Sequence, residues 1–415
     1  MTVVTGVQEE RTKLKKIVIS MLMASVLLGL FSNTSNATSY RDIMIEEPSL
    51  EVSSDVTPSL AKSAISAILM DANSGTVLFE KNSHEKLPPA SITEIMTMLL
   101  VMEAVEAGKI GLKDKVRASE NAASMGGSQI FLEVGEEMSV EDMLKGVAMA
   151  SGNDASVALA EKIAGSEEHF VQLMNERAKQ LGMNNTHFMN SNGLPVANHY
   201  STAYDIAIVS KELMKYDLIR EFTGKYQDYL RKDSEKPFWL VNTNKLVRFY
   251  EGADGVKTGY TSEAKFCLSA SAFRDGMRVI AVVMGAPSTK VRNAEVTQML
   301  DYAFSQYMNV VVVPKQTTIG TLEIERGMES KVDIVTNENI SIVVPRGTNT
   351  EEIQYELDVD DTIRAPISKG QPVGKLIVYH KDVIVKEFEI VAPYDIKKSN
   401  WFRLLKRATG SLFSN

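Results

Sequence analysis

The sequence predicts an α/β domain of the α+β kind, followed by a small all-β sandwich domain and a C-terminal amphipathic helix. Strand-like runs near residues 64–80 and 266–285 flank a series of helices, which favours one sheet built from early and late chain segments. Beyond residue 309, short apolar runs alternate with turn residues, as in a β-sandwich. Apolar side chains then recur at helical spacing near the C-terminus.

Length and composition fit a globular protein with room for two domains. The chain has 415 residues, of which 44% are hydrophobic and 24% charged. Its net charge of −8 argues against a nucleic-acid partner, because no strong positive field is available to attract phosphates. The single cysteine, Cys267, excludes an internal disulfide and a cysteine-based zinc site, and its apolar neighbours favour a buried structural thiol. The five histidines have no metal-like spacing, so we expect no metal or cofactor.

The N-terminus has the pattern of a secretory signal. Basic residues between Arg11 and Lys16 precede an apolar run, Ile17–Phe31, and small residues end at Ala37. We therefore expect a signal peptide over residues 1–37, with cleavage after Ala37, and a linker over residues 38–61. The alternative is an uncleaved membrane anchor, although the apolar run is short for a hydrocarbon core of about 30 Å. Under both interpretations, we expect the rest of the chain to be exported.

The predicted catalytic domain, residues 62–308, begins with a β-hairpin and continues with helices. Strands are expected at Ala64–Met70 and Thr76–Glu80, joined through the turn residues Asn73-Ser74-Gly75. An apolar helix follows at Ile92–Ala107 and stops at Gly108. A further helix starts at Ser139, reaches about Ala150, and is succeeded by one that starts near Asp154.

Two late strands complete this domain, at Phe266–Ala272 and Val279–Gly285, joined by Arg274-Asp275-Gly276. The β-sandwich is expected over residues 309–393. Its strands are predicted at residues 310–313, 318–324, 331–334, 340–344, 353–357, 376–379 and 383–391.

Residues 394–415 are predicted to form an amphipathic helix. Aromatic and leucine side chains such as Trp401, Phe402 and Leu405 share one face, and lysines and arginines lie among and before them. Such a helix suits an anionic membrane surface. The alternative is a helix that packs on the protein's own core.

Three short segments carry the chemistry. No G-x-S-x-G, H-E-x-x-H or phosphate-binding glycine loop is present. Instead Pro89-Ala90-Ser91-Ile92-Thr93 opens the apolar helix, Ser151-Gly152-Asn153 links two helices, and Lys257-Thr258-Gly259 leads into the late strands. Each segment alone is a weak signal, whereas the ordered set is specific.

With these motifs the chain resembles the serine D-alanyl-D-alanine carboxypeptidases, which are low-molecular-mass penicillin-binding proteins that trim peptidoglycan stem peptides. The resemblance covers nearly all of the chain that follows the signal, including residues 124–128 and 254–261. It implies a penicillin-recognising serine transpeptidase/β-lactamase-like fold. It also implies peptidoglycan stem peptides and β-lactam antibiotics as partners, and a location at the outer face of the bacterial cytoplasmic membrane.

The residues at these positions suit a serine acyl-transfer site. Ser91 lies at a helix N-terminus, where the helix dipole and free backbone N–H groups favour developing negative charge. The resemblance makes Ser91 the nucleophile, Ser151 a proton relay to the leaving group, and Asn153 a ligand of the substrate amide. On the alternative reading, Ser91, Ser151 and Asn153 simply cap helices.

By the same resemblance, the segment from Lys257 to Tyr260 binds the substrate. Lys257 and Thr258 would hold the terminal carboxylate of a D-Ala-D-Ala peptide. Gly259 continues the strand, whose edge can pair with the peptide backbone. The backbone N–H groups of Ser91 and Tyr260 would form the oxyanion hole.

Glu94 departs from the family motif S-x-x-K, in which a lysine accepts the serine proton. One helical turn separates Ser91 from Glu94, so both side chains share a face. In the family this lysine lies near the K-T-G lysine, so the resemblance implies that Glu94 is attracted to Lys257, with a gross Coulomb energy of about 4 kcal/mol at about 4 Å and an effective dielectric of about 20. Two outcomes remain open: a carboxylate base that supports weak activity, or a crippled enzyme. The alternative functions are an inactive envelope protein that binds or scaffolds peptidoglycan and, more remotely, a zinc peptidase.

Overall fold

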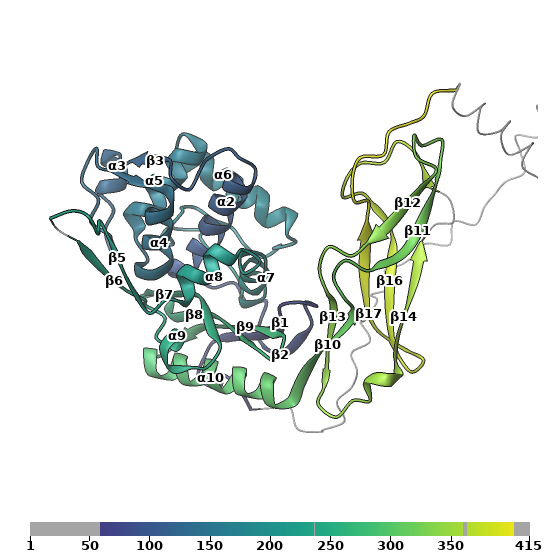
Figure 1. Ribbon diagram of the computed structural model, residues 1–415. Helices are drawn as coiled ribbons and strands as arrows, with labels where there is room; N and C mark the ends of the chain where they lie inside the picture. Colours follow the sequence, from purple (N-terminus) through teal and green to yellow (C-terminus); the bar gives the residue numbers. More distant parts are fainter. Residues whose placement is uncertain (1–58, 236, 360–362, 402–415) are drawn as a thin grey trace, which may run out of the picture. The chain divides into compact units, whose positions relative to one another are not determined.

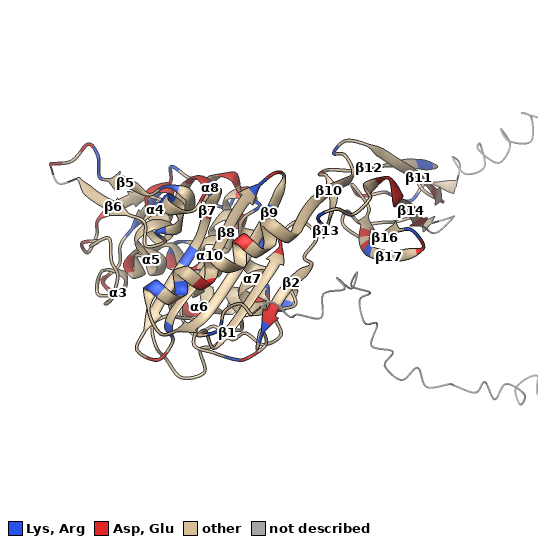
Figure 2. Cartoon of the chain, turned by 90° about the horizontal axis from the view of Figure 1, so that it is seen from below, with Lys and Arg blue, Asp and Glu red and all other residues tan. Residues whose placement is uncertain are grey.

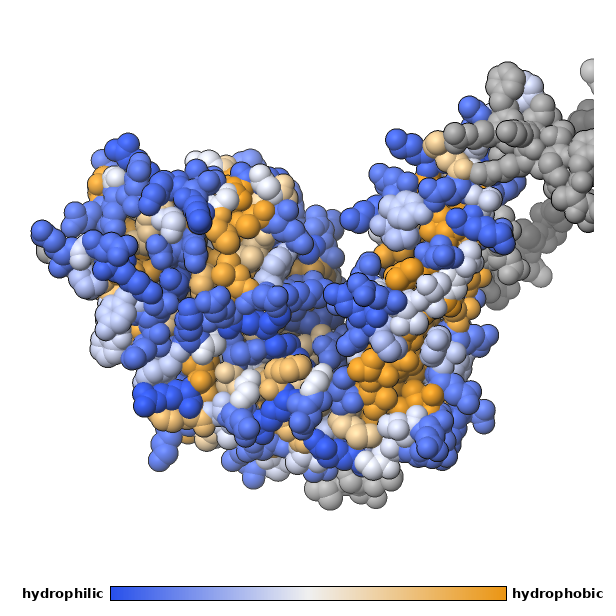
Figure 3. All heavy atoms as spheres, in the orientation of Figure 1, coloured by the Kyte–Doolittle hydropathy of each residue, from blue (hydrophilic) through white to orange (hydrophobic). Residues whose placement is uncertain are grey.

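A computed structural model describes residues 59–235, 237–359 and 363–401. The predicted signal peptide (1–37), nearly all of the predicted linker (38–61) and residues 402–415 of the predicted C-terminal helix lie outside the described residues. Charged residues of both signs are interspersed along the helices and loops, whereas the central strands of the larger sheet contain few (Figure 2). A space-filling view of one face shows hydrophilic side chains over most of it, with apolar patches between them (Figure 3).

The α/β domain is built on a five-stranded antiparallel sheet in the order β2-β1-β9-β8-β7. Early strand β1 pairs with late strand β9, which confirms the prediction that the sheet joins distant chain segments (Figure 1). β7 pairs only with β8 within the described sheet and so forms an edge. The strands are β1 Ser66–Asp71, β2 Val77–Lys81, β7 Ala253–Thr261, β8 Lys265–Arg274 and β9 Met277–Ala286.

Both predicted hairpins are present, because their turn residues tolerate positive φ angles. Gly75 has φ +75° between β1 and β2. Between β8 and β9, Asp275 and Gly276 have φ +49° and +76°, the pattern of the tight turn that matches strand twist. Asp and Gly are the residues that this turn favours.

Helices cover both faces of the sheet. Ile68 and Met70 of β1 pack with the main group of helices, whereas Ala67 and Leu69 pack with α10 on the other face. β1 is consequently buried along its whole length, as expected for a strand between two layers. The helices are α2 Glu94–Glu106, α3 Glu120–Ala123, α4 Val140–Ala150, α5 Asn153–Ala164, α6 Glu167–Gln180, α7 Ala203–Leu213, α8 Asp217–Gly224, α9 Leu246–Phe249 and α10 Thr289–Gln306.

Local signals set the helix ends near the site. The predicted stop after α2 is confirmed: Gly108 follows the helix with φ +67°. Ser139 caps α4 by accepting a hydrogen bond from the backbone N–H of Asp142 at 3.1 Å. The helix expected from Ile92 begins instead as a 3₁₀ turn, η1 Ala90–Thr93, which runs directly into α2.

Two short two-stranded sheets were absent from the sequence prediction. β3 Lys115–Arg117 pairs with β4 Glu137–Ser139, and β5 Gln227–Leu230 pairs with β6 Phe238–Val241. In the described part of the chain, no helix combines the length and apolar character that crossing a membrane requires.

The C-terminal domain consists of short strands around its own apolar core. The predicted strands are all present, in three small sheets ordered β10-β13, β12-β11-β15 and β14-β16-β17; β15 was not predicted. The elements are β10 Tyr307–Val313, β11 Thr318–Glu325, β12 Lys331–Val335, β13 Ile340–Pro345, η2 Thr350–Glu352, β14 Ile353–Val359, β15 Ile363–Arg364, β16 Pro372–His380 and β17 Val383–Val391.

The segment that follows β17 corrects one predicted boundary. Residues 394–400 were expected to start the C-terminal helix, but they are extended and bonded to the β domain. Ile396 pairs with Ile367 and is buried in the β core, and Lys398 pairs with Gly327. Burial of an apolar side chain therefore outweighs helical propensity here. The remainder of the predicted helix, from residue 402, lies outside the described residues.

Candidate active site

Ser91 occupies the 3₁₀ turn η1, held by close backbone contacts. Ala90 before it has φ +51°, a strained conformation for a residue with a side chain. Gly193 packs so closely that a Cβ atom there would overlap the carbonyl oxygen of Ala90. A Cβ at Gly259 of β7 would lie 3.1 Å from the backbone nitrogen of Ser91. The edge strand thus runs beside the serine, whose hydroxyl forms no hydrogen bond with any described residue.

Glu94, one helical turn after Ser91, forms a buried polar group with Ser151 and Lys257. The ammonium of Lys257 donates to Ser151 Oγ at 2.7 Å and lies 3.1 Å from Glu94 Oε2. The hydroxyl of Ser151 lies 3.2 Å from both carboxylate oxygens of Glu94. The side chains of Glu94 and Lys257 are both inaccessible to solvent. The expected attraction between Glu94 and Lys257 is therefore confirmed.

Burial dominates the ionisation of this group. Loss of hydration raises the pKa of Glu94 to about 7, although the neighbouring Lys257 and the bond from Ser151 act in the opposite direction. Burial likewise lowers the pKa of Lys257, partly offset by Glu94. Both side chains are thus closer to neutrality than exposed groups of the same kind, which is a property of functional sites.

Ser151 and Asn153 do not cap the helix that follows them. Ser151 ends α4 in the left-handed region, with φ +60°, and this turns its hydroxyl toward Glu94. Gly152 is the N-cap of α5 and no side chain caps that helix end. The Asn153 side-chain amide donates to the carbonyl of Gly126 at 2.7 Å, whereas its buried Oδ1 has no partner among the described residues. The capping alternative for these two residues is wrong.

The predicted substrate-binding residues follow one another along β7. Lys257, Thr258 and Gly259 are buried, and the hydroxyl of Thr258 donates to that of Thr243 at 2.9 Å. Tyr260 is 56% exposed and its ring lies 4.5 Å from that of Phe266. The structure therefore places Ser91, Glu94, Ser151, Lys257 and Gly259 around one site, with Asn153, Thr258 and Tyr260 next to them in the chain.

Three supporting residues were missed by sequence reasoning. Asp154 accepts hydrogen bonds from the backbone N–H groups of Ile130 and Leu132, and so holds the loop at residues 130–132 against the start of α5. Thr243 was not singled out, because nothing in its local sequence marks it. His199 Nδ1 accepts from the N–H of Met189, which leaves the protonated Nε2 to face Thr93 Oγ1 at 2.9 Å. Burial lowers the pKa of His199 to about 4, so the ring is neutral.

No group of three potential metal ligands occurs among the described histidines, cysteines, aspartates and glutamates. Cys267 is fully buried in β8, and burial raises the pKa of its thiol to about 11. The predicted burial of the thiol is therefore confirmed. Its raised pKa disfavours the reactive thiolate form.

Comparison with known proteins agrees with this geometry. Residues 52–288 match the family model of D-alanyl-D-alanine carboxypeptidase, and residues 307–398 match that of the penicillin-binding protein 5 C-terminal domain. The D-alanyl-D-alanine carboxypeptidase DacF of Bacillus subtilis is 53% identical over 85% of this chain and 91% of its own length. The corresponding DacC of Escherichia coli is 33% identical over 94% of this chain and 95% of its own length.

Solved structures give the same assignment. Penicillin-binding protein 5 of Haemophilus influenzae superposes with a TM-score of 0.67 at 30% identity, covering 83% of this chain and 100% of that one. The fold, the ordered motifs and the two matched segments together show that the chain belongs to the serine D-alanyl-D-alanine carboxypeptidases, the low-molecular-mass penicillin-binding proteins.

Proposed function

We propose that this protein removes the terminal D-alanine from peptidoglycan stem pentapeptides through an acyl-Ser91 intermediate, at a rate limited by Glu94. The observation that supports this most directly is the meeting of the three motifs at one edge strand. Ser91 touches β7 through Gly259, and Ser151 contacts Lys257. Motif residues far apart in sequence have little structural reason to share a buried polar group unless they act together.

Substrate binding would use the free edge of β7. The peptide terminus would lie against Lys257 and Thr258, where an ammonium and a hydroxyl suit a carboxylate. The scissile carbonyl would then face the backbone N–H groups of Ser91 and Tyr260, which act as the oxyanion hole. The unpartnered Oδ1 of Asn153 offers an acceptor for a substrate amide N–H.

The reaction would proceed in two acyl-transfer steps. Ser91 Oγ forms a bond to the carbonyl carbon of the penultimate D-alanine and loses its proton to the buried polar group that contains Glu94. The C–N bond to the terminal D-alanine breaks, and its amine receives a proton through Ser151. Water then attacks the ester, which releases the shortened peptide and restores the Ser91 hydroxyl.

Glu94 would slow the first step for two reasons. Its carboxylate is bonded to both Ser151 and Lys257, so Lys257 is already partnered when the substrate carboxylate arrives. The proton of Ser151 faces Glu94 instead of the leaving group. A carboxylate with a pKa of about 7 still accepts protons near neutral pH, which leaves a route for weak catalysis.

Penicillin labelling tests this proposal. We expect the purified protein to react slowly with a fluorescent penicillin, and Glu94→Lys to accelerate labelling by at least about 100-fold, the lower range for a general base. Ser91→Ala in the Glu94→Lys background should abolish labelling. Release of D-alanine from an acyl-D-Ala-D-Ala peptide should follow the same order. No gain from Glu94→Lys would reject the alignment of the S-x-x-K motif.

The buried Glu94–Lys257 pair also favours a second candidate, an inactive envelope protein that binds or scaffolds peptidoglycan. This candidate predicts that the unmodified chain binds D-Ala-D-Ala peptides without releasing D-alanine at any rate above solution hydrolysis.

We further propose that the protein is exported and acts at the outer face of the cytoplasmic membrane. The sequence of residues 1–37 supports export, and the apolar and basic side chains of residues 401–413 support attachment to the membrane surface.

A further inference from the structure

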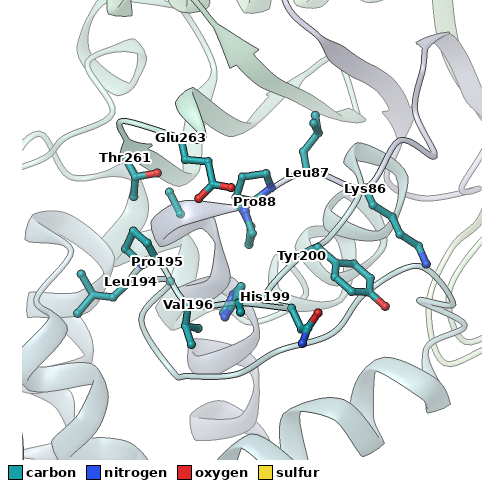
Figure 4. A pocket seen from close by; sticks show the side chains of 15 residues that line it. Lys86, Leu87, Pro88, Leu194, Pro195, Val196, His199, Tyr200, Thr261 and Glu263 are labelled. Atoms are coloured by element: carbon teal, nitrogen blue, oxygen red, sulfur yellow. The ribbon is translucent and has the colours of Figure 1, made fainter.

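A cavity of about 530 Å³ opens beside the catalytic serine. One wall is the segment Lys86–Ala90, which leads into Ser91, and another is the loop Gly193–Tyr200. Thr261 and Glu263, which follow Tyr260 at the end of β7, close a third side (Figure 4). The cavity is therefore continuous with the segments that build the active site. Pro89 and Ala90 line it, whereas Ser91, Ser151 and Lys257 do not.

The direction of β7 indicates what enters this cavity. The proposed carboxylate-binding residues Lys257 and Thr258 come first along the strand, and the oxyanion donor Tyr260 comes later. A peptide that places its C-terminus at the former and its scissile carbonyl at the latter runs antiparallel to β7. Its upstream residues then continue toward Thr261 and Glu263. Because strands and extended peptides both advance about 3.4 Å per residue, the residue before the acylated D-alanine lies near Thr261.

The side chains around the cavity are apolar on its walls and charged at its rim. Pro88, Pro195 and Val196 supply carbon surface. Glu263 is exposed and forms no ion pair or hydrogen bond with any residue that the structure describes. Lys86 approaches from a different side, with its ammonium 4.7 Å from the centre of the Tyr200 ring. Such an arrangement suits a methylene chain that ends in a charged group.

His199 on the cavity wall adds no positive charge. Its ring is buried and neutral, because its pKa is about 4. Among the residues that line the cavity, Glu263 therefore supplies the negative charge. Lys86, on another side of the cavity, supplies the positive charge.

We propose that this cavity is a specificity subsite for the side chain of the stem residue that precedes the two D-alanines, and that Glu263 binds the terminal ammonium of a diamino acid there. This inference rests on the proposed function for the direction of the bound peptide. The ammonium is shared by a lysyl and a diaminopimelyl residue. The diaminopimelyl side chain adds a carboxylate, for which Lys86 is the available cation.

Equilibrium binding to the full-length protein tests the subsite without requiring turnover. The probes are Nα-acetyl-L-lysyl-D-Ala-D-Ala, its Nε-acetyl derivative and the corresponding diaminopimelyl peptide, measured by titration calorimetry at low ionic strength. We expect the free ammonium to bind about three- to fivefold more tightly than the acetylated form, the size of a partly exposed ion pair.

Variants assign the effect to the cavity. Glu263→Gln should reduce this ratio to about one, and Glu263→Asp should retain part of it. Glu251→Gln, an exposed glutamate just before β7, removes the same charge and should keep the full ratio. If Lys86 binds the extra carboxylate, the diaminopimelyl peptide should bind more tightly than the lysyl peptide, and Lys86→Gln should remove this difference. If the diaminopimelyl and lysyl peptides bind equally tightly, the ammonium alone is recognised. Melting temperatures confirm that each variant is folded.

A ratio of one in the unmodified protein, or a ratio that persists in Glu263→Gln, would overturn the subsite. These outcomes differ from failure of the proposed function, which appears as absent penicillin labelling and absent D-alanine release in Glu94→Lys whatever the binding ratio is.

Discussion

At the scale of single residues, the fully buried Glu94 is the most consequential side chain. At 3.1 Å from Lys257, the gross attraction is about 5 kcal/mol at an effective dielectric of about 20. Removing both charges from water costs several kcal/mol per ion, so the pair adds little net stability. Its importance lies in what it occupies: the ammonium and the hydroxyl that the proposed chemistry requires.

The stability of the protein should depend on pH through Glu94. Because burial raises its pKa from 4.5 to about 7, the folded state binds this proton more tightly than the unfolded chain does. The stabilising contribution is therefore complete below about pH 4.5 and is lost as the pH rises through about 7. At about 1.4 kcal/mol per pKa unit, the loss is at most about 3.5 kcal/mol.

Urea unfolding at pH 5 and pH 8 measures this contribution. The free energy of unfolding of the unmodified chain, minus that of Glu94→Gln, should fall by about 2 to 3 kcal/mol between the two pH values. The same difference taken with Glu251→Gln, which changes an exposed carboxylate, should stay constant. A Glu94 difference that rises with pH would mean that ion pairing outweighs burial.

The pairing of residues 94 and 257 was predicted from the family resemblance, which places the fourth residue of the S-x-x-K motif near the K-T-G lysine, and from the opposite charges of the two side chains. The sequence could not predict that Ser151 lies equally close to both oxygens of Glu94. That contact depends on the left-handed backbone of Ser151, and a non-glycine residue at positive φ has no dependable sequence signal.

At the scale of secondary-structure elements, the turn that carries Ser91 is fixed from outside by glycine. Gly193 has φ +85°, and a Cβ atom there would overlap the Ala90 carbonyl. Since this contact is with backbone, it cannot be relieved by a side-chain rotation. The position of Ser91 is thus set by a loop that lies about one hundred residues later in the sequence.

Gly193→Ala should therefore displace the η1 turn. We expect a loss of stability greater than about 2 kcal/mol, since both strain and overlap contribute, and loss of penicillin labelling in the Glu94→Lys background. Gly165→Ala is the matched control: its φ is +82° but nothing lies within 4 Å of the added carbon. It should cost about 1 kcal/mol and leave labelling intact. Equal effects of the two changes on labelling would show that the contact does not position Ser91.

Secondary-structure elements were predicted correctly where the sequence contains typical turn residues or a long apolar run. The Asp275-Gly276 turn and the continuous apolar run of α2 both identify their elements locally. The β3–β4 and β5–β6 pairs were missed because each strand has only three or four residues. Pairings this short are stabilised by tertiary contacts more than by periodicity.

At the scale of the whole molecule, two domains with separate cores follow each other along the chain. The fully buried part of the C-terminal core begins at Val313, and partly buried side chains from Met308 onward pack against it, close to the expected boundary at 309. The C-terminal limit was set too early, because Ile396 completes that core. A single buried isoleucine within a polar, basic stretch resembles the apolar face of a helix, so the pattern alone does not distinguish the two.

The proposed membrane attachment predicts a clear effect of truncation. The full chain should sediment with anionic lipid vesicles, and a chain that ends at Asn400 should remain in the supernatant. Raising the salt from about 0.1 M to about 1 M should weaken binding, since the Debye length falls from about 10 Å to about 3 Å. Equal sedimentation of the truncated chain would place the attachment site elsewhere.

Because the only cysteine of the chain is buried in β8, the protein is well suited to site-specific labelling. Alkylating reagents need the thiolate of an accessible cysteine, and Cys267, with a pKa of about 11 and no exposed surface, does not provide one. A cysteine introduced at the exposed Ser262 would consequently be the sole attachment point for a fluorophore, with the native cysteine left in place. Peptide arrival at the neighbouring cavity could then be followed in real time as a change in emission.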